Sequence, residues 1–128
     1  MKENKFYQMN AIKLAYVGDA IFSLMIRKHF VENTEMKNRD LNKTVNSIVC
    51  AKAQAQFLEN VIEDLTDIEK DIILRARNAH VNNKAKNSSF EEYNKATQFE
   101  ALLGYLYLTN EKDKLEKIVQ NCIEHANK

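Results

Sequence analysis

Apolar residues recur at intervals of three and four along most of this chain, which is the spacing of one face of an α-helix. The pattern predicts an all-α fold of about five main helices. The first two run roughly over residues 10–31 and 38–59, the third starts at Thr66, the fourth covers about 89–109, and the last lies near the end of the chain. Two of these starts carry a capping box, in which a hydroxyl residue and a glutamate three positions later satisfy free backbone N–H groups: Thr66-Asp67-Ile68-Glu69 and Ser89-Phe90-Glu91-Glu92.

The apolar positions also predict which side of each helix faces the core. The second helix places on one side Leu41, Val45, Ile48, Ala51, Ala55 and Leu58. The third directs inward Ile68, Ile72, Ala76 and Ala79, and the last aligns Leu115, Ile118, Val119, Cys122 and Ile123. Residues 80–89, HVNNKAKNSS, lack this periodicity and predict an exposed loop.

The composition agrees with a single helical domain over residues 1–128. Apolar residues make up 45% of the chain, which is enough for a core, and the absence of proline together with only two glycines favours long helices. Cys50 and Cys122 are too few for a disulfide framework or a metal motif, so a reducing, cytoplasmic location is expected. No apolar stretch has the length of a membrane span, so no membrane contact is expected.

Two acidic residues interrupt the apolar helical stretches, Asp19 in LAYVGDAIFSLMI and Glu100 in FEALLGYLYL. An unpaired carboxylate is costly in apolar surroundings, and it either takes up a proton or binds a cation. A glycine lies within about one helical turn of each acid, Gly18 and Gly104, although a mid-helix glycine costs about 1 kcal/mol relative to alanine. We therefore expect the first and fourth helices to cross closely at four small residues: Ala15, Gly18, Ala101 and Gly104.

Such a crossing would bring both carboxylates to one divalent ion. Carboxylate and water oxygens suit Mg²⁺, and an ion held there would activate water for attack on a phosphodiester. The alternative is that Asp19 and Glu100 face water on the polar sides of amphipathic helices, with the glycines as ordinary packing contacts. Periodicity alone leaves both interpretations open.

The charge distribution adds one local basic segment. The net charge of +1 gives no support by itself for nucleic-acid binding. Between residues 75 and 87, however, four basic residues occur with no acid among them: Arg75, Arg77, Lys84 and Lys86. Duplex RNA is bound largely through phosphates and 2′-hydroxyls, so these cations are candidate phosphate contacts and Asn78 a candidate hydroxyl partner. The alternative is a solvated loop, and Lys43 and Lys52 are further candidate contacts without support.

Three segments carry a resemblance to a known family. LAYVGDAIFSLMIR at residues 14–27 resembles the signature helix of the ribonuclease III family, and FEALLGYLYL at residues 99–108 resembles its partner helix. The stretch RARNAHVNNKAKNSSFEEYNKATQFEALLGYLYL is similar to the equivalent part of Mini-III, the short bacterial branch that lacks a double-stranded RNA-binding domain. The resemblance covers essentially the whole chain, with both acids, both glycines and the basic segment in order.

This resemblance implies a Mg²⁺-dependent endonuclease for double-stranded RNA, with Mn²⁺ as a substitute cofactor. It implies a single ribonuclease III-like domain that acts as a symmetric homodimer with one active site per subunit. For the Mini-III branch it implies the precursor of the large-subunit (23S) ribosomal RNA as substrate. Asp19 aligns with the catalytic aspartate of the signature and Glu100 with a metal-binding glutamate, so both are expected to serve catalysis and metal binding. Arg77 and Asn78 match the RNA-binding segment of the family.

The chain departs from the family at three positions that are generally acidic in the full-length enzymes: Ile12, Ala15 and Thr97. Their spacing from Asp19 and Glu100 predicts that they face the site, so the metal should have fewer protein ligands and more water. The first helix is also apolar on more than one face, and a second face of this kind could meet another copy of the chain.

Two other functions are compatible with the sequence. The missing acids could make the protein a catalytically inactive relative of ribonuclease III, which binds double-stranded RNA without cutting it. A helical interaction module with no RNA role would instead show negligible affinity for duplex RNA even at low salt, where phosphate contacts are strongest.

Overall fold

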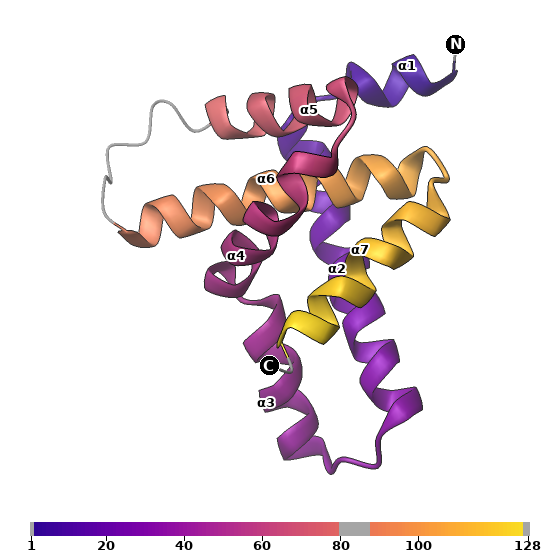
Figure 1. Cartoon of the computed structure of the whole chain (residues 1–128), viewed down its shortest axis with the longest axis vertical. Coiled ribbons are helices and arrows are strands. Elements are labelled where there is room, and N and C mark those ends of the chain that lie inside the picture. The colour runs from indigo at the N-terminus through magenta and orange to yellow at the C-terminus, as the bar shows by residue number, and fades with distance from the viewer. Residues whose placement is uncertain (1, 80–87, 127–128) are drawn as a thin grey trace.

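A computed structural model describes residues 2–79 and 88–126, with side chains over 5–79 and 90–126 (Figure 1). Within these ranges the chain forms seven α-helices, one 3₁₀-helix and no strand, which confirms the all-α prediction. The elements are α1 (Lys2–Tyr7), α2 (Ala11–Asn33), α3 (Asn38–Val49), α4 (Ala51–Val61), η1 (Ile62–Asp64), α5 (Asp67–Asn78), α6 (Ser88–Leu108) and α7 (Lys112–Ala126).

The two longest helices, α2 and α6, cross at the centre of the molecule, and the others pack around them (Figure 1). Both α4 and α5 lie against α6, while α3 lies against α2. None of the helices in the described ranges is long and apolar enough to cross a lipid bilayer. The crossing of α2 and α6 is therefore the feature that positions the candidate site.

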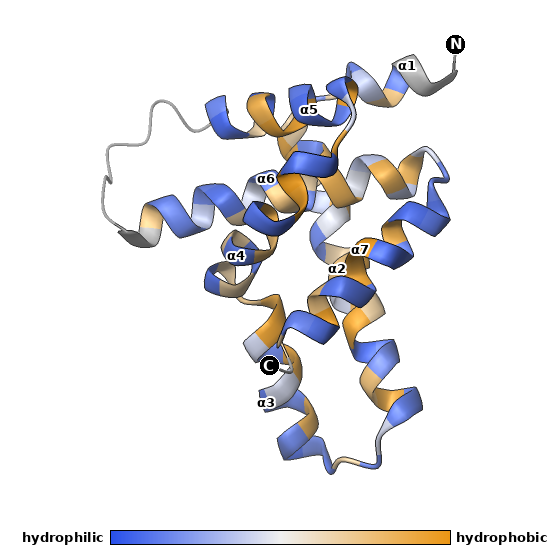
Figure 2. Ribbon diagram, in the orientation of Figure 1, coloured by the Kyte–Doolittle hydropathy of each residue, from blue (hydrophilic) through white to orange (hydrophobic). Residues whose placement is uncertain are grey.

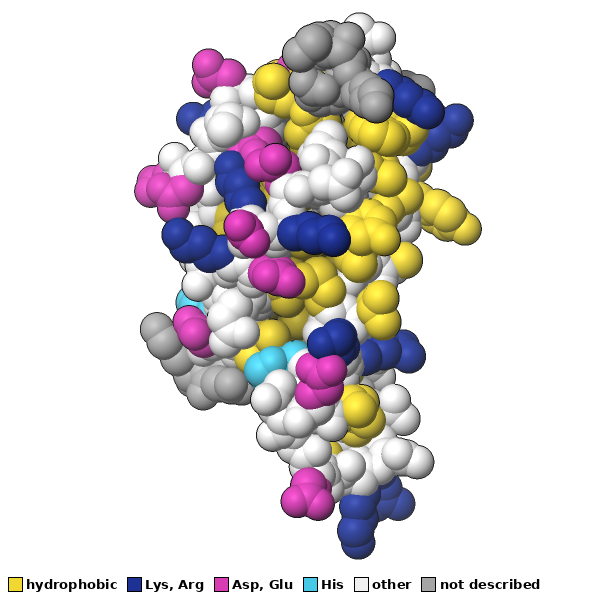
Figure 3. Space-filling view, turned by 90° about the vertical axis from the view of Figure 1, so that its right-hand side faces the viewer, with side chains coloured by type: hydrophobic (Ala, Val, Ile, Leu, Met, Phe, Trp, Pro, Cys, Tyr) yellow, Lys and Arg dark blue, Asp and Glu magenta, His cyan; other side chains and the backbone are white. Residues whose placement is uncertain are grey.

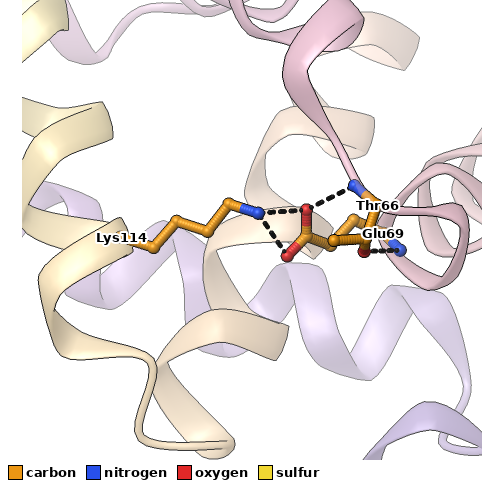
Figure 4. Close-up of polar contacts among 3 residues, drawn as sticks. All are labelled: Thr66, Glu69 and Lys114. Atoms are coloured by element: carbon orange, nitrogen blue, oxygen red, sulfur yellow. Dashed lines mark hydrogen bonds and ion pairs between the residues drawn. The ribbon is translucent and has the colours of Figure 1, made fainter.

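Local hydrogen bonds explain where two of these helices begin. The Asn10 side chain caps α2 by accepting a bond of 2.7 Å from the Ile12 amide. The capping box predicted at Thr66 is present, because its hydroxyl accepts from the Glu69 amide at 3.2 Å and the Glu69 carboxylate accepts from the Thr66 amide at 3.0 Å. Glu69 also pairs with Lys114 of α7, at 2.6 and 2.8 Å, so one carboxylate both starts α5 and holds α7 (Figure 4). The second predicted box depends on the Ser89 side chain, which lies outside the described side chains.

The predicted second helix is wrong in one respect, because it is two helices separated at Cys50. This residue has an extended backbone, with φ −71° and ψ 161°. The apolar stripe continues through the break, so periodicity did not reveal it. The freed carbonyl of Val49 accepts a bond of 2.8 Å from the Gln54 side chain, which satisfies a group that the end of α3 would otherwise leave unpaired. The short α1 was not predicted at all, since the polar start of the chain has no amphipathic stripe.

The core consists of two groups of buried side chains that share α2 and α6. The larger group contains Phe22, Phe57 and Phe99, whose rings lie 5.4–6.3 Å apart between centroids. The smaller group contains Leu14 and Tyr105 with several alanines. Hydrophobic and hydrophilic residues alternate along the helices, as expected where each helix packs by one side (Figure 2).

Most, though not all, of the predicted inward positions are buried. In α5, Ile72 and Ala76 are buried as predicted, but Ile68 is 48% exposed and Ala79 is exposed. The buried face includes Ile73 and Glu69 instead. The prediction placed the isoleucine inward in preference to the neighbouring acid. The structure reverses this, because Lys114 compensates the charge of Glu69 and makes its burial tolerable.

Candidate active site

The backbones of α2 and α6 touch at two glycines, which confirms the predicted close crossing. A Cβ atom added to Gly18 would lie only 1.7 Å from the Glu100 carbonyl oxygen. A Cβ atom added to Gly104 would lie 1.9 Å from the Leu14 carbonyl oxygen. The neighbouring Ala15 and Ala101 are buried as well. No side chain larger than hydrogen fits at either glycine, so the two helices are held at the closest approach that their backbones allow.

This contact brings the two predicted acids together. Asp19 follows Gly18 directly, and Glu100 is the residue whose carbonyl Gly18 contacts. Burial, the negative charge of Asp19 and a hydrogen bond with Asp19 together raise the pKa of Glu100 to about 8, while a hydrogen bond from Gln54 opposes that rise. The structure therefore shows two neighbouring carboxyl groups, and the interpretation in which they face water separately does not hold.

The residues of the site differ in their exposure to solvent. Asp19 is exposed, whereas Glu100 is partly buried and Gln54 is only 2% exposed. Within residues 2–79 and 88–126, no group of three or more acidic, histidine or cysteine side chains is arranged to hold a metal. The charged part of the site is therefore this one pair of carboxylates.

The donor set nevertheless fits a hard divalent cation. Both acidic side chains offer oxygen, which Mg²⁺ prefers, and a cation between them would offset the burial and the repulsion by Asp19 that raise the pKa of Glu100. A third oxygen is available, because the amide oxygen of Gln54 is buried and has no hydrogen-bond partner among the residues that the structure describes. The role of Gln54 was not predicted, since a glutamine in the first turn of a helix has no distinctive sequence signal.

The three positions for which the family resemblance implied acidic residues supply no charge here. Ile12 is 39% exposed, and Ala15 and Thr97 are each 5% exposed. The Thr97 hydroxyl donates to the Tyr93 carbonyl of its own helix, at 3.0 Å. The surroundings of the two acids are therefore less charged than the family pattern implies.

Arg75, one of the predicted RNA contacts, is engaged within the protein. Its guanidinium donates to the carbonyls of Tyr7 and Met9, lies 3.2 Å from Asp71 and packs 4.9 Å from the centroid of the Tyr7 ring. The Tyr7 hydroxyl also donates to Asp71, at 2.9 Å. Arg75 thus fastens the N-terminal segment to α5. The sequence could not show this, because α1 itself was not predicted.

The other predicted RNA contacts lie at or beyond the end of α5. Arg77 and Asn78 are exposed in its last turn, while Lys84 and Lys86 lie outside the described residues. The Arg77 carbonyl accepts from the Asn94 side chain at 3.2 Å, and Asn94 in turn accepts from Gln98 at 2.6 Å. These bonds fix the end of α5 to the part of α6 that precedes Glu100.

The outward side of α2 exposes an apolar stripe over most of its length. Its members are Ile12 (39% exposed), Tyr16 (83%), Leu24 (59%) and Val31 (62%). Ala20 is also exposed and continues the stripe between Tyr16 and Leu24. In the space-filling view, hydrophobic side chains gather along one edge of the molecule with some Lys and Arg side chains among them, while acidic side chains lie away from that edge (Figure 3). Because Asp19 is exposed and lies three residues after Tyr16, on the same face of α2, the exposed side of the acid pair lies beside this stripe.

Comparison with known proteins identifies the class. Residues 12–111 match the ribonuclease III domain, so the chain belongs to the ribonuclease III family. It is 40% identical to Mini-ribonuclease 3 of Enterococcus faecalis, over 93% of this chain and 92% of that protein. It is 36% identical to Mini-ribonuclease 3 of Staphylococcus aureus, over 98% of this chain and 96% of that protein. Within the family, the Mini-ribonuclease 3 proteins are thus its relatives along nearly the whole chain, as the sequence resemblance implied.

A solved structure supports the same fold. The crystal structure of a protein from Fusobacterium nucleatum superposes with a TM-score of 0.82 at 32% sequence identity. The match covers 92% of this chain and 94% of that protein. The arrangement of helices around the α2–α6 crossing is therefore shared with an experimentally determined structure.

Proposed function

We propose that this protein is a divalent-metal-dependent endoribonuclease that cleaves double-stranded RNA. The observation that carries the proposal is the pair of carboxylates, Asp19 and Glu100, held together at the crossing of α2 and α6. Membership of the ribonuclease III family supports the same chemistry. The natural substrate that we propose is the precursor of the 23S ribosomal RNA, in the cytoplasm.

Asp19 and Glu100 are the proposed holders of Mg²⁺, or of Mn²⁺ in its place. When bound, the ion supplies charge neutralisation at the phosphodiester and an activated water. The protein contributes the geometry, because the glycine contact sets how closely the two helices that carry the acids approach. The exposure of Asp19 leaves one side of the site accessible to an RNA phosphate. The uncharged Ile12, Ala15 and Thr97 leave the rest of the ion's coordination to water.

RNA contact is proposed for the basic segment that starts at the end of α5. Arg77 and Asn78 are exposed and their helix end is fixed to α6, so both are placed relative to the acids. Lys84 and Lys86 would add phosphate contacts from the following segment. Arg75 has a different role in this proposal, since its contacts with Tyr7 and Met9 make it an anchor for the helix.

We also propose that the active form is a symmetric homodimer formed through the exposed stripe of α2. Tyr16, Leu24 and Val31 are large apolar residues that water would otherwise surround. A two-fold arrangement buries the same surface on both copies. Because Asp19 lies beside the stripe, the dimer would place one acid pair on each side of the interface, with one site available for each RNA strand.

The replacement Asp19→Asn tests the assignment. It removes one charge with little change in shape, so we expect folding and duplex binding to persist while cleavage falls by at least about 100-fold. The assay follows a labelled RNA duplex with Mg²⁺ and measures binding in parallel. Unaltered cleavage by Asp19→Asn would refute the assigned site. If the wild-type protein bound the duplex and gave no product, it would be an inactive RNA-binding relative.

A further inference from the structure

Gln54 lies beside the acid pair and is almost completely buried. Its exposed fraction is 2%, and it belongs to the first turn of α4, which packs against α6. One bond from its amide nitrogen, 2.8 Å long, goes to the Val49 carbonyl at the end of α3. Its side chain also interacts with the Glu100 carboxyl group as a donor, which lowers the pKa of that group. Gln54 thus links the junction of α3 and α4 to one of the two proposed metal-holding residues.

The amide oxygen of this side chain has no partner among the described residues. A buried polar atom left unpaired is unfavourable, and such atoms are rare in folded proteins. The nitrogen donates the bond to Val49, and an amide can donate only through its nitrogen, so the oxygen is free to accept a hydrogen bond. Because the Gln54 side chain interacts with Glu100, this unpaired oxygen belongs to a residue beside the acid pair.

We propose that Gln54 is a positioning residue of the metal site, which orients Glu100 through its amide nitrogen and accepts a hydrogen bond from the hydration shell of the cation through its amide oxygen. This inference rests on the proposed function, since it assumes a divalent cation between Asp19 and Glu100. It adds a neutral third group to a site whose charged part is only two acids. Residues that orient metal ligands typically contribute about 10- to 100-fold to metal affinity or activity.

A purely structural role is the competing explanation, because the bond to Val49 already caps α3. The two roles separate in a titration with metal ions. Gln54→Met keeps the length and bulk of the side chain but removes both polar atoms. We expect it to fold, since it also removes the unpaired oxygen, and to bind Mn²⁺ at least about tenfold more weakly, as measured by electron paramagnetic resonance. Mn²⁺ affinity equal to that of the wild-type protein would overturn the proposal.

Gln98→Met is the matched control. Gln98 is also a buried glutamine, 6% exposed, but its amide bonds Asn94 on its own helix. We expect this variant to lose some thermal stability and to keep wild-type Mn²⁺ affinity. If Gln98→Met weakened Mn²⁺ binding as much as Gln54→Met, the effect would come from general loosening of the core and the proposal would fail.

The variant Gln54→Glu provides a second test of the proposal, which can be used even if Gln54→Met does not fold. It keeps an acceptor oxygen but adds a third carboxyl group beside Asp19 and Glu100, so we expect a lower Tm in the presence of EDTA. Mg²⁺ should then raise the Tm of Gln54→Glu by more than it raises that of the wild-type protein. An equal or smaller rise would count against a role toward the cation, because a cap on α3 has no reason to depend on Mg²⁺.

The variant Asp19→Asn distinguishes a failure of the proposed function from a failure of the role of Gln54. If Asp19→Asn binds Mn²⁺ like the wild-type protein, the acid pair is not the metal site and the proposed function fails. If Asp19→Asn loses Mn²⁺ while Gln54→Met retains it, the metal site stands and only the role of Gln54 is refuted.

Discussion

At the scale of single residues, Glu100 is the acid whose ionised form the protein destabilises. It is partly buried next to Asp19, and its pKa is raised to about 8. The free protein therefore favours a proton on this carboxyl group at neutral pH. A cation that binds the ionised pair must displace that proton, so metal binding should strengthen as the pH rises toward 8.

The raised pKa predicts how stability without metal depends on pH. Glu100 binds its proton more tightly in the folded state, with a pKa of about 8, than in the unfolded state, with a model value of 4.5. The contribution of Glu100 to the unfolding free energy should therefore be fully present below pH 4.5, fall as the pH rises through this window and level off above about 8. The total change is on the order of a few kcal/mol, from about 1.4 kcal/mol per pKa unit.

Urea unfolding in EDTA at several pH values tests this effect against Glu100→Gln. The variant cannot ionise at this position, so its stability relative to the wild-type protein should increase steadily from pH 5 to pH 8. A difference that stays constant over this range would show that the pKa of Glu100 is not raised.

At the scale of elements, the glycine crossing was predictable and the helix junctions were not. Gly18 and Gly104 stand out in the sequence because mid-helix glycine is unfavourable, and an acid beside each one pointed to a shared site. The break at Cys50 left no comparable signal, since the apolar spacing continues across it. The burial of Glu69 depends on Lys114, which is far along the chain, and no local pattern indicates such a pair.

Gly18→Ala tests the crossing directly. A Cβ atom would lie 1.7 Å from the Glu100 carbonyl oxygen, so the helices must separate. Overpacking of this kind costs about 1–3 kcal/mol or more, against a gain of about 1 kcal/mol in helix propensity. We expect a net loss of unfolding free energy in urea of about 2 kcal/mol. The rise in Tm caused by Mg²⁺ should also shrink, because the acids move apart. An alanine variant as stable as the wild-type protein would contradict the backbone contact.

At the scale of the whole molecule, a net charge of +1 gives little overall attraction for RNA, so binding must depend on local surfaces. Two surfaces are available among the described residues, the apolar stripe of α2 and the exposed end of α5. The stripe suits a second copy of the chain, and the helix end with its following basic segment suits phosphates. If each surface has its proposed role, a mutation in the stripe should impair dimer formation, and a mutation at the end of α5 should impair RNA binding without affecting the dimer.

The dimer can be tested without touching the acids. Tyr16→Lys combined with Leu24→Lys places two charges in the middle of the stripe, and we expect sedimentation velocity to show a monomer where the wild-type protein is a dimer. Leu74→Lys is the control, because Leu74 is 47% exposed but lies on α5 and is not part of the stripe of α2, and this variant should remain dimeric. A wild-type protein that sediments as a monomer at micromolar concentration would refute the proposed interface.

The two neighbouring arginines of α5 should separate RNA binding from folding. Arg77 is exposed, so Arg77→Ala should weaken duplex binding and reduce the slope of log affinity against log salt by about one, as expected for one lost phosphate contact. Arg75→Ala should instead lower the Tm, because Arg75 bonds the Tyr7 and Met9 carbonyls, and should leave the salt slope unchanged. Both variants are measured in the Asp19→Asn background, so that the duplex is not cleaved during titration. A salt slope reduced equally by Arg75→Ala would mean that its guanidinium leaves α1 to contact RNA, and the anchoring role would then be wrong.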